Sequence, residues 1–373
     1  MNVNVPLLDL VGQYHAIRDE ILPALQSVIE SQQFIMGPAV AELETAVAQL
    51  SHARHGIGCA SGTDALLLPL KALNLKPGDE VITTPFTFFA TAGAIHNAGG
   101  TPVFVDIEPE TFNIDPRAVE AAITPRTRAI VPVHLYGQMV DLERLLAVTQ
   151  RRGIPIIEDA CQSIGARRSI DGVWRMAGEL GWATAYSFFP SKNLGAWGDG
   201  GMIVTSDDAA ADRLKKLRLH GGAKQYHHDE VGTNSRLDTL QAAILLAKLP
   251  RLAGWSARRR EHAAYYTKAL AGMSGVRTPV TASGNEHIFH QYTLRAERRD
   301  ALQAHLKAKG IGSAIYYPIP LHRQNCFAHL GYKAGSLPES ERAAGAALSL
   351  PIFPELTQAQ LDYVVETIAG FYR

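Results

Sequence analysis

Cysteine is scarce in this sequence. Only three occur, Cys59, Cys161 and Cys326, and they are widely separated and odd in number. A disulfide framework needs an even set, and zinc sites need closely spaced pairs of ligands. We therefore expect reduced thiols, no metal site and a cytoplasmic protein.

An excess of charge of one sign and long apolar runs are also missing. Lys+Arg and Asp+Glu each total 36, so the formal net charge is zero and no global field attracts nucleic acid or an anionic membrane. The first residues lack the basic start and apolar centre of a signal peptide, and no later stretch has the apolar length of a membrane span. We expect a soluble protein with neither nucleic-acid nor membrane partners, so local groups must hold any anionic ligand.

The chain has 373 residues, which is too long for one average domain, and 46% of them are hydrophobic, which is enough for a large core. Between residues 53 and 206, short apolar runs alternate with helical patterns, which is typical of βαβ units. The runs are rich in Val, Ile and Ala instead of alternating with polar residues, as expected for strands covered on both faces. The expected strands are Glu80–Thr84, Pro102–Asp106, Ala129–Leu135, Pro155–Glu158, Ala183–Phe188 and Met202–Thr205. This pattern predicts a three-layer α/β/α domain with a mostly parallel sheet.

Helical periodicity and mixed patterns define the rest of the chain. Beyond about residue 250 the periodicity is mixed, which predicts a small α+β domain. We expect a large domain over residues 1–250 and a small one over 251–373, with the first forty or so residues folding back onto the small domain. The expected elements are helices at Asp141–Arg152, Asp238–Leu252, Trp255–Leu270 and Arg299–Lys309, a strand at Gln291–Arg295 and a last helix from Thr357.

Small and hydroxyl residues precede a helical pattern in the segment Gly58–Leu73. Ser61, Gly62 and Thr63 would lie at the N-terminus of that helix. Backbone N–H groups, a hydroxyl and the helix dipole favour phosphate at such a place. A plain helix cap at Ser61 or Thr63 would give the same pattern.

An apolar strand ends in two acids in the segment Ile154–Ala166. Glu158 and Asp159 would then lie at the sheet edge where α/β proteins bind ligands. A carboxylate there can pair with a pyridinium nitrogen and keep it protonated. A helix cap and a metal-binding carboxylate are the alternatives for Asp159.

One lysine, Lys192, lies between a strand with aromatic residues at its end and a glycine-rich turn in the segment Tyr186–Ser206. Lysines are mostly solvated. The apolar flanks of Lys192 would instead desolvate its amine and lower the pKa, as a Schiff-base lysine requires.

In this order the three segments resemble the DegT/DnrJ/EryC1/StrS family of nucleotide-sugar aminotransferases, which depend on pyridoxal phosphate (PLP). The likeness covers essentially the whole chain and includes ASGTDAL, GDEVITTPFTFFATA, IIEDACQSIGA, SFFPSKNLGAWGDGG and YYPIPLH. The resemblance implies the fold of fold-type I PLP aminotransferases.

The resemblance also implies roles for single residues. The two catalytic residues would be Lys192, which holds the cofactor as a Schiff base and moves a proton, and Asp159, which pairs with the pyridine nitrogen. The other implied cofactor contacts are Gln162 at the ring hydroxyl, Phe88 on the ring face, and Gly62, Thr63, Ser187 and a second subunit's Asn234 at the phosphate. A homodimer with shared active sites is therefore expected. Core packing for Phe88 and a turn role for Asn234 stay open.

Less specific segments bear on the substrate. Cationic and hydrogen-bonding candidates are Arg236, His220, Lys224, His227 and His228, and the sugar end would meet Tyr316, Tyr317 and His322. The implied reaction moves an amino group from an amino acid, with glutamate favoured, to a UDP- or dTDP-linked 3-keto sugar. The alternatives are an aminotransferase for a 4-keto sugar or a cyclitol ketone, and a non-catalytic PLP-binding regulatory protein. A sugar dehydratase of the same fold would have histidine in place of Lys192.

Overall fold

The computed structural model describes residues 4–224 and 226–373 and contains one large mixed sheet. Its strands are β1 (His55–Cys59), β2 (Glu80–Thr83), β3 (Thr101–Phe104), β4 (Thr127–Val131), β5 (Ile157–Asp159), β8 (Ala183–Ser187) and β9 (Gly201–Thr205). They form the rows β1-β9-β8-β5 and β3-β2-β4, and parallel bridges from Ile130 to Ile156 and from Val133 to Asp159 join β4 to β5. Only β9 pairs antiparallel with its neighbours in these rows. A mostly parallel sheet was expected, and it is found.

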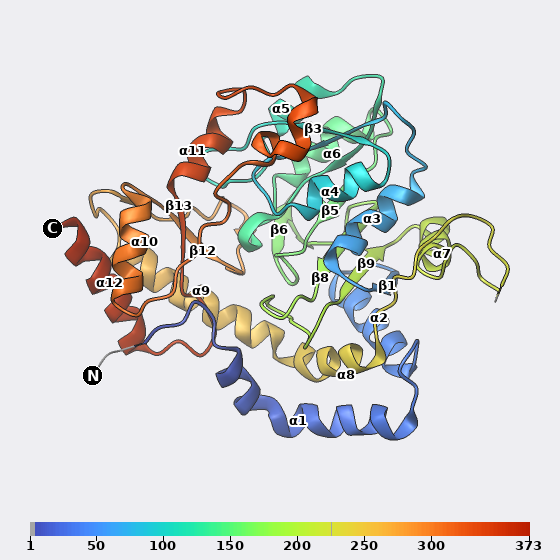
Figure 1. The fold of residues 1–373 in the computed structure, drawn as a ribbon, viewed down its shortest axis with the longest axis horizontal. Coiled ribbons are helices and arrows are strands. Elements are labelled where there is room, and N and C mark those ends of the chain that lie inside the picture. The colour runs from blue at the N-terminus through green and yellow to red at the C-terminus, as the bar shows by residue number, and fades with distance from the viewer. Residues whose placement is uncertain (1–3, 225) are drawn as a thin grey trace.

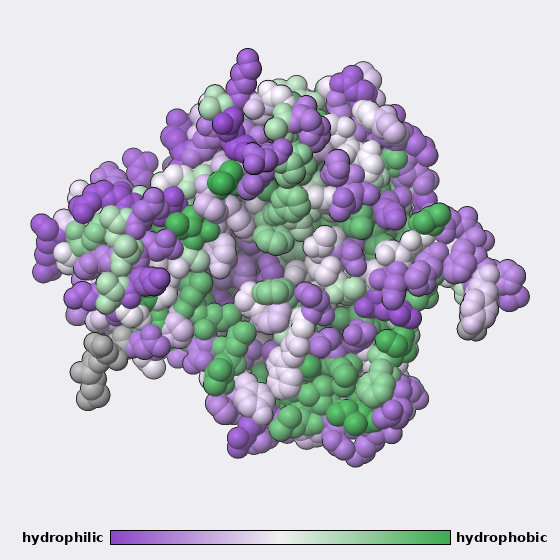
Figure 2. Space-filling view, viewed as in Figure 1, coloured by the Kyte–Doolittle hydropathy of each residue, from purple (hydrophilic) through white to green (hydrophobic). Residues whose placement is uncertain are grey.

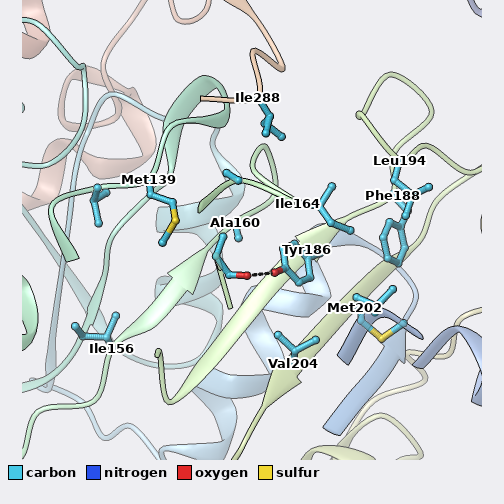
Figure 3. Close-up of a cluster of buried hydrophobic side chains, with 14 of the residues drawn as sticks. Met139, Ile156, Ala160, Ile164, Tyr186, Phe188, Leu194, Met202, Val204 and Ile288 are labelled. Carbon is cyan, nitrogen blue, oxygen red and sulfur yellow. Dashed lines mark hydrogen bonds between the residues drawn. The ribbon is translucent and has the colours of Figure 1, made fainter. Parts of the chain in front are cut away.

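Helices cover both faces of this sheet (Figure 1). They are α2 (Pro38–Leu50), α3 (Gly62–Ala72), α4 (Ala90–Asn97), α5 (Pro116–Ala122), α6 (Leu142–Gln150), α7 (Asp208–Leu217) and α8 (Thr239–Lys248). Successive residues of β2 point to opposite faces, so Ile82 belongs to the buried cluster with residues of α2, α5, α6 and α8, whereas Val81 belongs to the cluster with residues of α3, α4 and α7. Figure 3 shows part of the first core, including Tyr186, Phe188 and Met202. The three-layer α/β/α prediction is confirmed.

A second, smaller sheet lies in the C-terminal part of the chain. It contains β10 (Val276–Arg277), β12 (Tyr292–Ala296) and β13 (Ala347–Leu350), all antiparallel. Its helices are α9 (Leu252–Ala269), α10 (Arg299–Ala308), α11 (Pro338–Ala346) and α12 (Gln358–Tyr372). The predicted strand and the three predicted helices in this region occur, and Thr357 caps α12 through a reciprocal capping box with Gln360. This part is the small α+β unit of the expected fold.

The chain start contacts both parts. Val5 lies in the core of the small sheet and bridges to Ile311, whereas α1 (Leu10–Ser31) packs on α8 in the large part. The turn η2 (Leu249–Arg251) separates α8 from α9 near the expected boundary at residue 250, and the division into two domains there stays a prediction. The remaining elements are β6 (Arg167–Ile170), β7 (Val173–Met176), β11 (Asn285–Glu286), η1 (Leu135–Gly137), η3 (Leu321–Arg323) and η4 (Asn325–Leu330). Across residues 4–224 and 226–373, no helix is both long and apolar enough to span a membrane.

Buried histidine makes the fold sensitive to acid. The His287 ring is 4% exposed and stacks on Phe289 with centroids 3.9 Å apart, and burial lowers the pKa of His287 from 6.5 to about 3. The unfolded chain then binds the proton first as pH falls below 6.5, so stability is complete above pH 6.5 and falls towards pH 3. The loss from this one group is up to about 1.4 kcal/mol for each pH unit.

Replacement of His287 by asparagine is therefore expected to flatten the fall in stability between pH 6.5 and 5. Asparagine can still accept the bond that Phe289 N donates to His287 Nδ1 at 2.9 Å. Urea unfolding midpoints measured at several pH values provide the test, with His329→Asn at an exposed position as the control. Equal pH slopes in wild type and His287→Asn would contradict the assigned burial effect.

Candidate active site

The carboxyl ends of β5 and β8 meet the N-terminus of α3. β5 ends at Asp159 and pairs in parallel with β8, which ends at Ser187. A Cβ added to Gly62 would lie 2.5 Å from Ser187 Cβ, so only glycine permits α3 to approach the strand end this closely. Two residues 125 positions apart in the sequence are thus in contact, as the resemblance implies for a shared phosphate.

The first turn of α3 offers free donors. Ser61 Oγ accepts from Asp64 N at 3.1 Å and caps the helix. The N–H groups of Gly62 and Thr63 belong to the first turn and have no intrahelical acceptor. Among the residues that the structure describes, the Ser187 hydroxyl accepts only a 3.4 Å bond from Phe189 N. Neutral donors and a helix dipole at one point suit a phosphate dianion.

Lys192 lies in the turn after β8, where its backbone N donates to Phe189 O at 2.8 Å. Its side chain is partly exposed. Desolvation lowers the pKa of the Lys192 amine, while the nearby Cys161 thiol and the Asp159 carboxylate act in the opposite direction. The amine therefore has the desolvated surroundings that its apolar flanks predict.

The Asp159 carboxylate is 5% exposed and is held at both oxygens. Thr91 Oγ1 donates to Oδ2 at 2.8 Å, and Cys161 N donates to Oδ1 at 3.2 Å. Thr91 is itself hydrogen-bonded to Thr87 at 3.1 Å. A carboxylate with one donor on each oxygen keeps lone pairs for a cationic N–H group.

The Gln162 amide is oriented by two contacts. Its Oε1 accepts from Tyr136 N at 2.7 Å, and its Nε2 donates to Tyr317 OH at 3.1 Å. Burial raises the pKa of Tyr317, which therefore stays protonated. The Tyr317 ring lies 6.4 Å from that of Phe88, which is 59% exposed and so is not a core residue. Gln162, Tyr317 and Phe88 thus connect in one group.

The cationic candidates lie on a segment whose Ser235 accepts from Ala60 N and donates to Asp64 at the start of α3. An open hollow of about 790 Å³ is lined by His220, Lys224, His228 and Arg236 in the described residues of the segment 219–236, which project beyond α7 (Figure 1). His228 Nδ1 lies 3.1 Å from His220 O. Asn234 and His227 are exposed in the same segment. Among the described residues, no hydrogen bond joins this segment to Asp159 or Gln162.

The three candidates for the sugar end, Tyr316, Tyr317 and His322, have different surroundings. Tyr316 is half-buried next to Tyr317, and its backbone O accepts from Tyr136 OH. The His322 ring is instead buried, with Nε2 3.0 Å from Glu341 Oε1 and the ring against Tyr332. Leu321 of the η3 turn lies in a buried cluster with Phe327. Among the described residues, no hydrogen bond or ring contact joins His322 to Tyr316 or Tyr317.

Three residues that orient the side chains of the site are not predicted by the sequence. Thr91 is one of several hydroxyl residues in TTPFTFFATA, and nothing local distinguishes it. Tyr136 orients Gln162 through its backbone N, which carries no side-chain signal. Asn193 Oδ1 lies 2.9 Å from the buried His290 Nδ1 and so fixes the turn after Lys192. Only Asn193, adjacent to Lys192 in the sequence, had a positional signal.

Comparison with known proteins places this geometry in a family. The model of the DegT/DnrJ/EryC1/StrS aminotransferase family matches residues 15–369. A Geobacillus stearothermophilus protein named "Pleiotropic regulatory protein" is 56% identical over 373 residues, covering 100% of this chain and 99% of the relative.

Two further relatives have names that describe an aminotransferase or its chemistry. A UDP-N-acetyl-3-dehydro-alpha-D-glucosamine 3-aminotransferase from Acidithiobacillus ferrooxidans is 47% identical, covering 98% of each chain. The crystal structure of S. venezuelae DesV in complex with a ketimine intermediate has a TM-score of 0.96 and 42% identity, covering 99% of each chain. The chain therefore belongs to the DegT/DnrJ/EryC1/StrS aminotransferase family, whose cofactor is PLP.

Proposed function

We propose that this protein moves an amino group from an amino acid, with L-glutamate favoured, to a nucleotide-linked 3-keto sugar carrying UDP or dTDP. The observation that carries the proposal is the convergence of Lys192, Asp159 and Gln162 beside the Gly62–Ser187 contact. The 3-amino sugar chemistry in the name of the 47% identical relative supports the 3-keto position.

The residues present fit PLP. Gly62, Thr63 and Ser187 supply neutral donors for its phosphate, Asp159 an acceptor for its ring nitrogen, and Gln162 an oriented amide for its ring hydroxyl. When bound, PLP supplies an electron sink for the carbon that carries the amino group.

The chain's own residues would position and protonate the substrate. A Lys192 amine of lowered pKa exists as free base in a larger fraction near neutral pH, so it can take a proton from the amino-bearing carbon and return one to it. Thr91 and Cys161 N hold the Asp159 carboxylate in one orientation. Phe88 and Tyr317 would shield the reacting carbon from water.

A homodimer is part of the proposal. Asn234 and Arg236 lie on the projecting segment 219–236, where Tyr226 is 86% and Val231 87% exposed in the single chain. Exposed apolar residues also gather over α1, where Figure 2 shows a green face next to α8. A surface of this kind marks a protein interface. A second subunit's Asn234 would then complete the phosphate site. We also propose a cytoplasmic location, in keeping with three free cysteines.

A substrate panel tests the function. UDP- and dTDP-linked 3-amino and 4-amino sugars, and an aminocyclitol, are each incubated with the PLP-loaded protein and 2-oxoglutarate, and glutamate formation is measured. We expect turnover with a 3-amino sugar. Turnover with only the 4-amino sugars or the aminocyclitol would overturn the 3-keto assignment.

The same panel addresses the regulatory alternative, which the name of the 56% identical relative favours. A non-catalytic regulator would bind PLP but form no glutamate with any amino sugar. That result would overturn the proposed activity while leaving family membership intact.

A further inference from the structure

Three arginines face one hollow on the far side of Tyr136 from Gln162. The hollow has a volume of about 330 Å³ and lies between β10, β12, α11 and the loop that precedes α5. Arg277, Arg295 and Arg342 line it, together with Glu110 and Glu339. No part of the proposed transfer reaction uses these residues.

The three arginine side chains carry like charges and repel one another. Arg277 and Arg295 are directly opposite in the antiparallel pair of β10 and β12, and like charges in that position destabilise a sheet. Arg342 adds a third cation, and Glu339 pairs with it through an i,i+3 contact. Desolvation contributes most to the lowered pKa of Arg295; Arg277 and Arg342 lower it further, whereas Glu339 acts in the opposite direction.

Arg295 forms no direct ion pair among the described residues, and the nearby Glu339 is paired with Arg342. Its guanidinium lies over the Phe112 ring, 4.3 Å from the centroid, and donates to Pro109 O. These contacts fix the plane of the guanidinium and leave further N–H donors towards the hollow. A partly desolvated cation held in this way is stabilised by an anion.

The hollow is separate from the candidate active site. Phe112 and Tyr136 stand between them, with ring centroids 5.6 Å apart. The Tyr136 backbone N bonds to Gln162 on one side, while Thr293 and Arg295 lie on the hollow side. The cofactor phosphate cradle at Gly62 and Ser187 belongs to other elements.

We propose that this hollow binds a dianionic phosphate group, either free phosphate or the phosphoryl group of a small metabolite. Arginine forks match phosphate oxygens in pairs, and a dianion would neutralise the repulsion between Arg277 and Arg295. Glu110 and Glu339 restrict the site to one such group, since a larger polyanion would meet their carboxylates.

Thermal unfolding of the PLP-saturated protein tests the site. Inorganic phosphate, added at constant ionic strength against chloride, is expected to raise the wild-type midpoint by roughly 2–4 °C at tens of Kd. Arg277→Gln is expected to lose this rise without a lower midpoint in chloride, because Arg277 is exposed on a two-residue strand and its removal relieves repulsion. Arg295→Gln should lose the rise as well.

Arg298→Gln serves as the matched control, because Arg298 stacks on Phe371 outside the hollow and should keep the wild-type rise. A parallel titration with a hexose phosphate distinguishes the two sources of the group. A rise at lower concentration identifies a metabolite, and a rise only with inorganic phosphate identifies the free ion. No rise in the wild type, or an equal rise in Arg277→Gln, would overturn the proposal.

Discussion

Lys192→Ala is expected to lose amino transfer by at least about 10⁴-fold, because one side chain supplies both the covalent hold on PLP and the proton transfer. The variant keeps the Gly62–Ser187 contact and the Asp159 carboxylate, so it should still bind PLP without a covalent link. Reduction with borohydride should fix PLP to the wild-type peptide that contains Lys192 and to no peptide of the variant.

Two comparisons make this result specific. Lys215→Ala removes an exposed lysine on α7 and should retain wild-type turnover and labelling. A small primary amine added to Lys192→Ala should restore part of the proton transfer, because the vacated space adjoins the reacting carbon. Labelling of Lys192→Ala at the wild-type level would show that another lysine holds the cofactor.

The features that the sequence predicted well are those set by local patterns. The strand Ala183–Phe188 appears as β8 within one residue at its end, because a short run of small, β-branched and aromatic residues lies between Gly181 and Pro190. The helix expected from Thr357 begins there because the Thr357–Gln360 capping box lies within four residues. Lys192 was identifiable because its apolar flanks are adjacent to it in the chain.

The features that it missed depend on contacts between distant segments. The pairing of His55 with Thr205 makes β9 antiparallel, and a short Val- and Ile-rich strand has no direction of its own. Thr91 reaches Asp159 across 68 positions, and Gln162 reaches Tyr317 across 155. The burial of His322 was not predicted either, because it goes with the neighbouring Leu321, which lies in a buried cluster with the distant Phe104 and Leu337.

Contacts with other segments hold the Asp159 carboxylate in place. Asp159 carries one donor on each oxygen, and both donors are placed by other elements: Thr91 by α4 and Cys161 N by the turn after β5. The remaining lone pairs can accept from a further N–H or O–H donor.

Asp159→Asn is the second variant with a large expected effect. Asparagine has the same shape and can still accept from Thr91 or Cys161 N, so the fold and PLP binding should persist. It lacks the negative charge that would keep the pyridine nitrogen protonated, and a neutral ring withdraws electrons from the reacting carbon much less effectively. We expect kcat to fall by about 10²–10⁴-fold with a small change in the affinity for PLP.

Thr91→Val is the matched variant for this argument, because it removes the 2.8 Å bond to Asp159 Oδ2 and leaves the charge in place. If Asp159 acts through its charge, Thr91→Val should lose on the order of tenfold or less, corresponding to one hydrogen bond to a charged group. If Asp159 acts only as a structural anchor, the two variants should lose similar activity, and Asp159→Asn should lower the thermal midpoint. Single-turnover rates with the preferred amino sugar, measured together with unfolding midpoints, separate these outcomes. A near-normal rate for Asp159→Asn would show that the protonated ring nitrogen has another source.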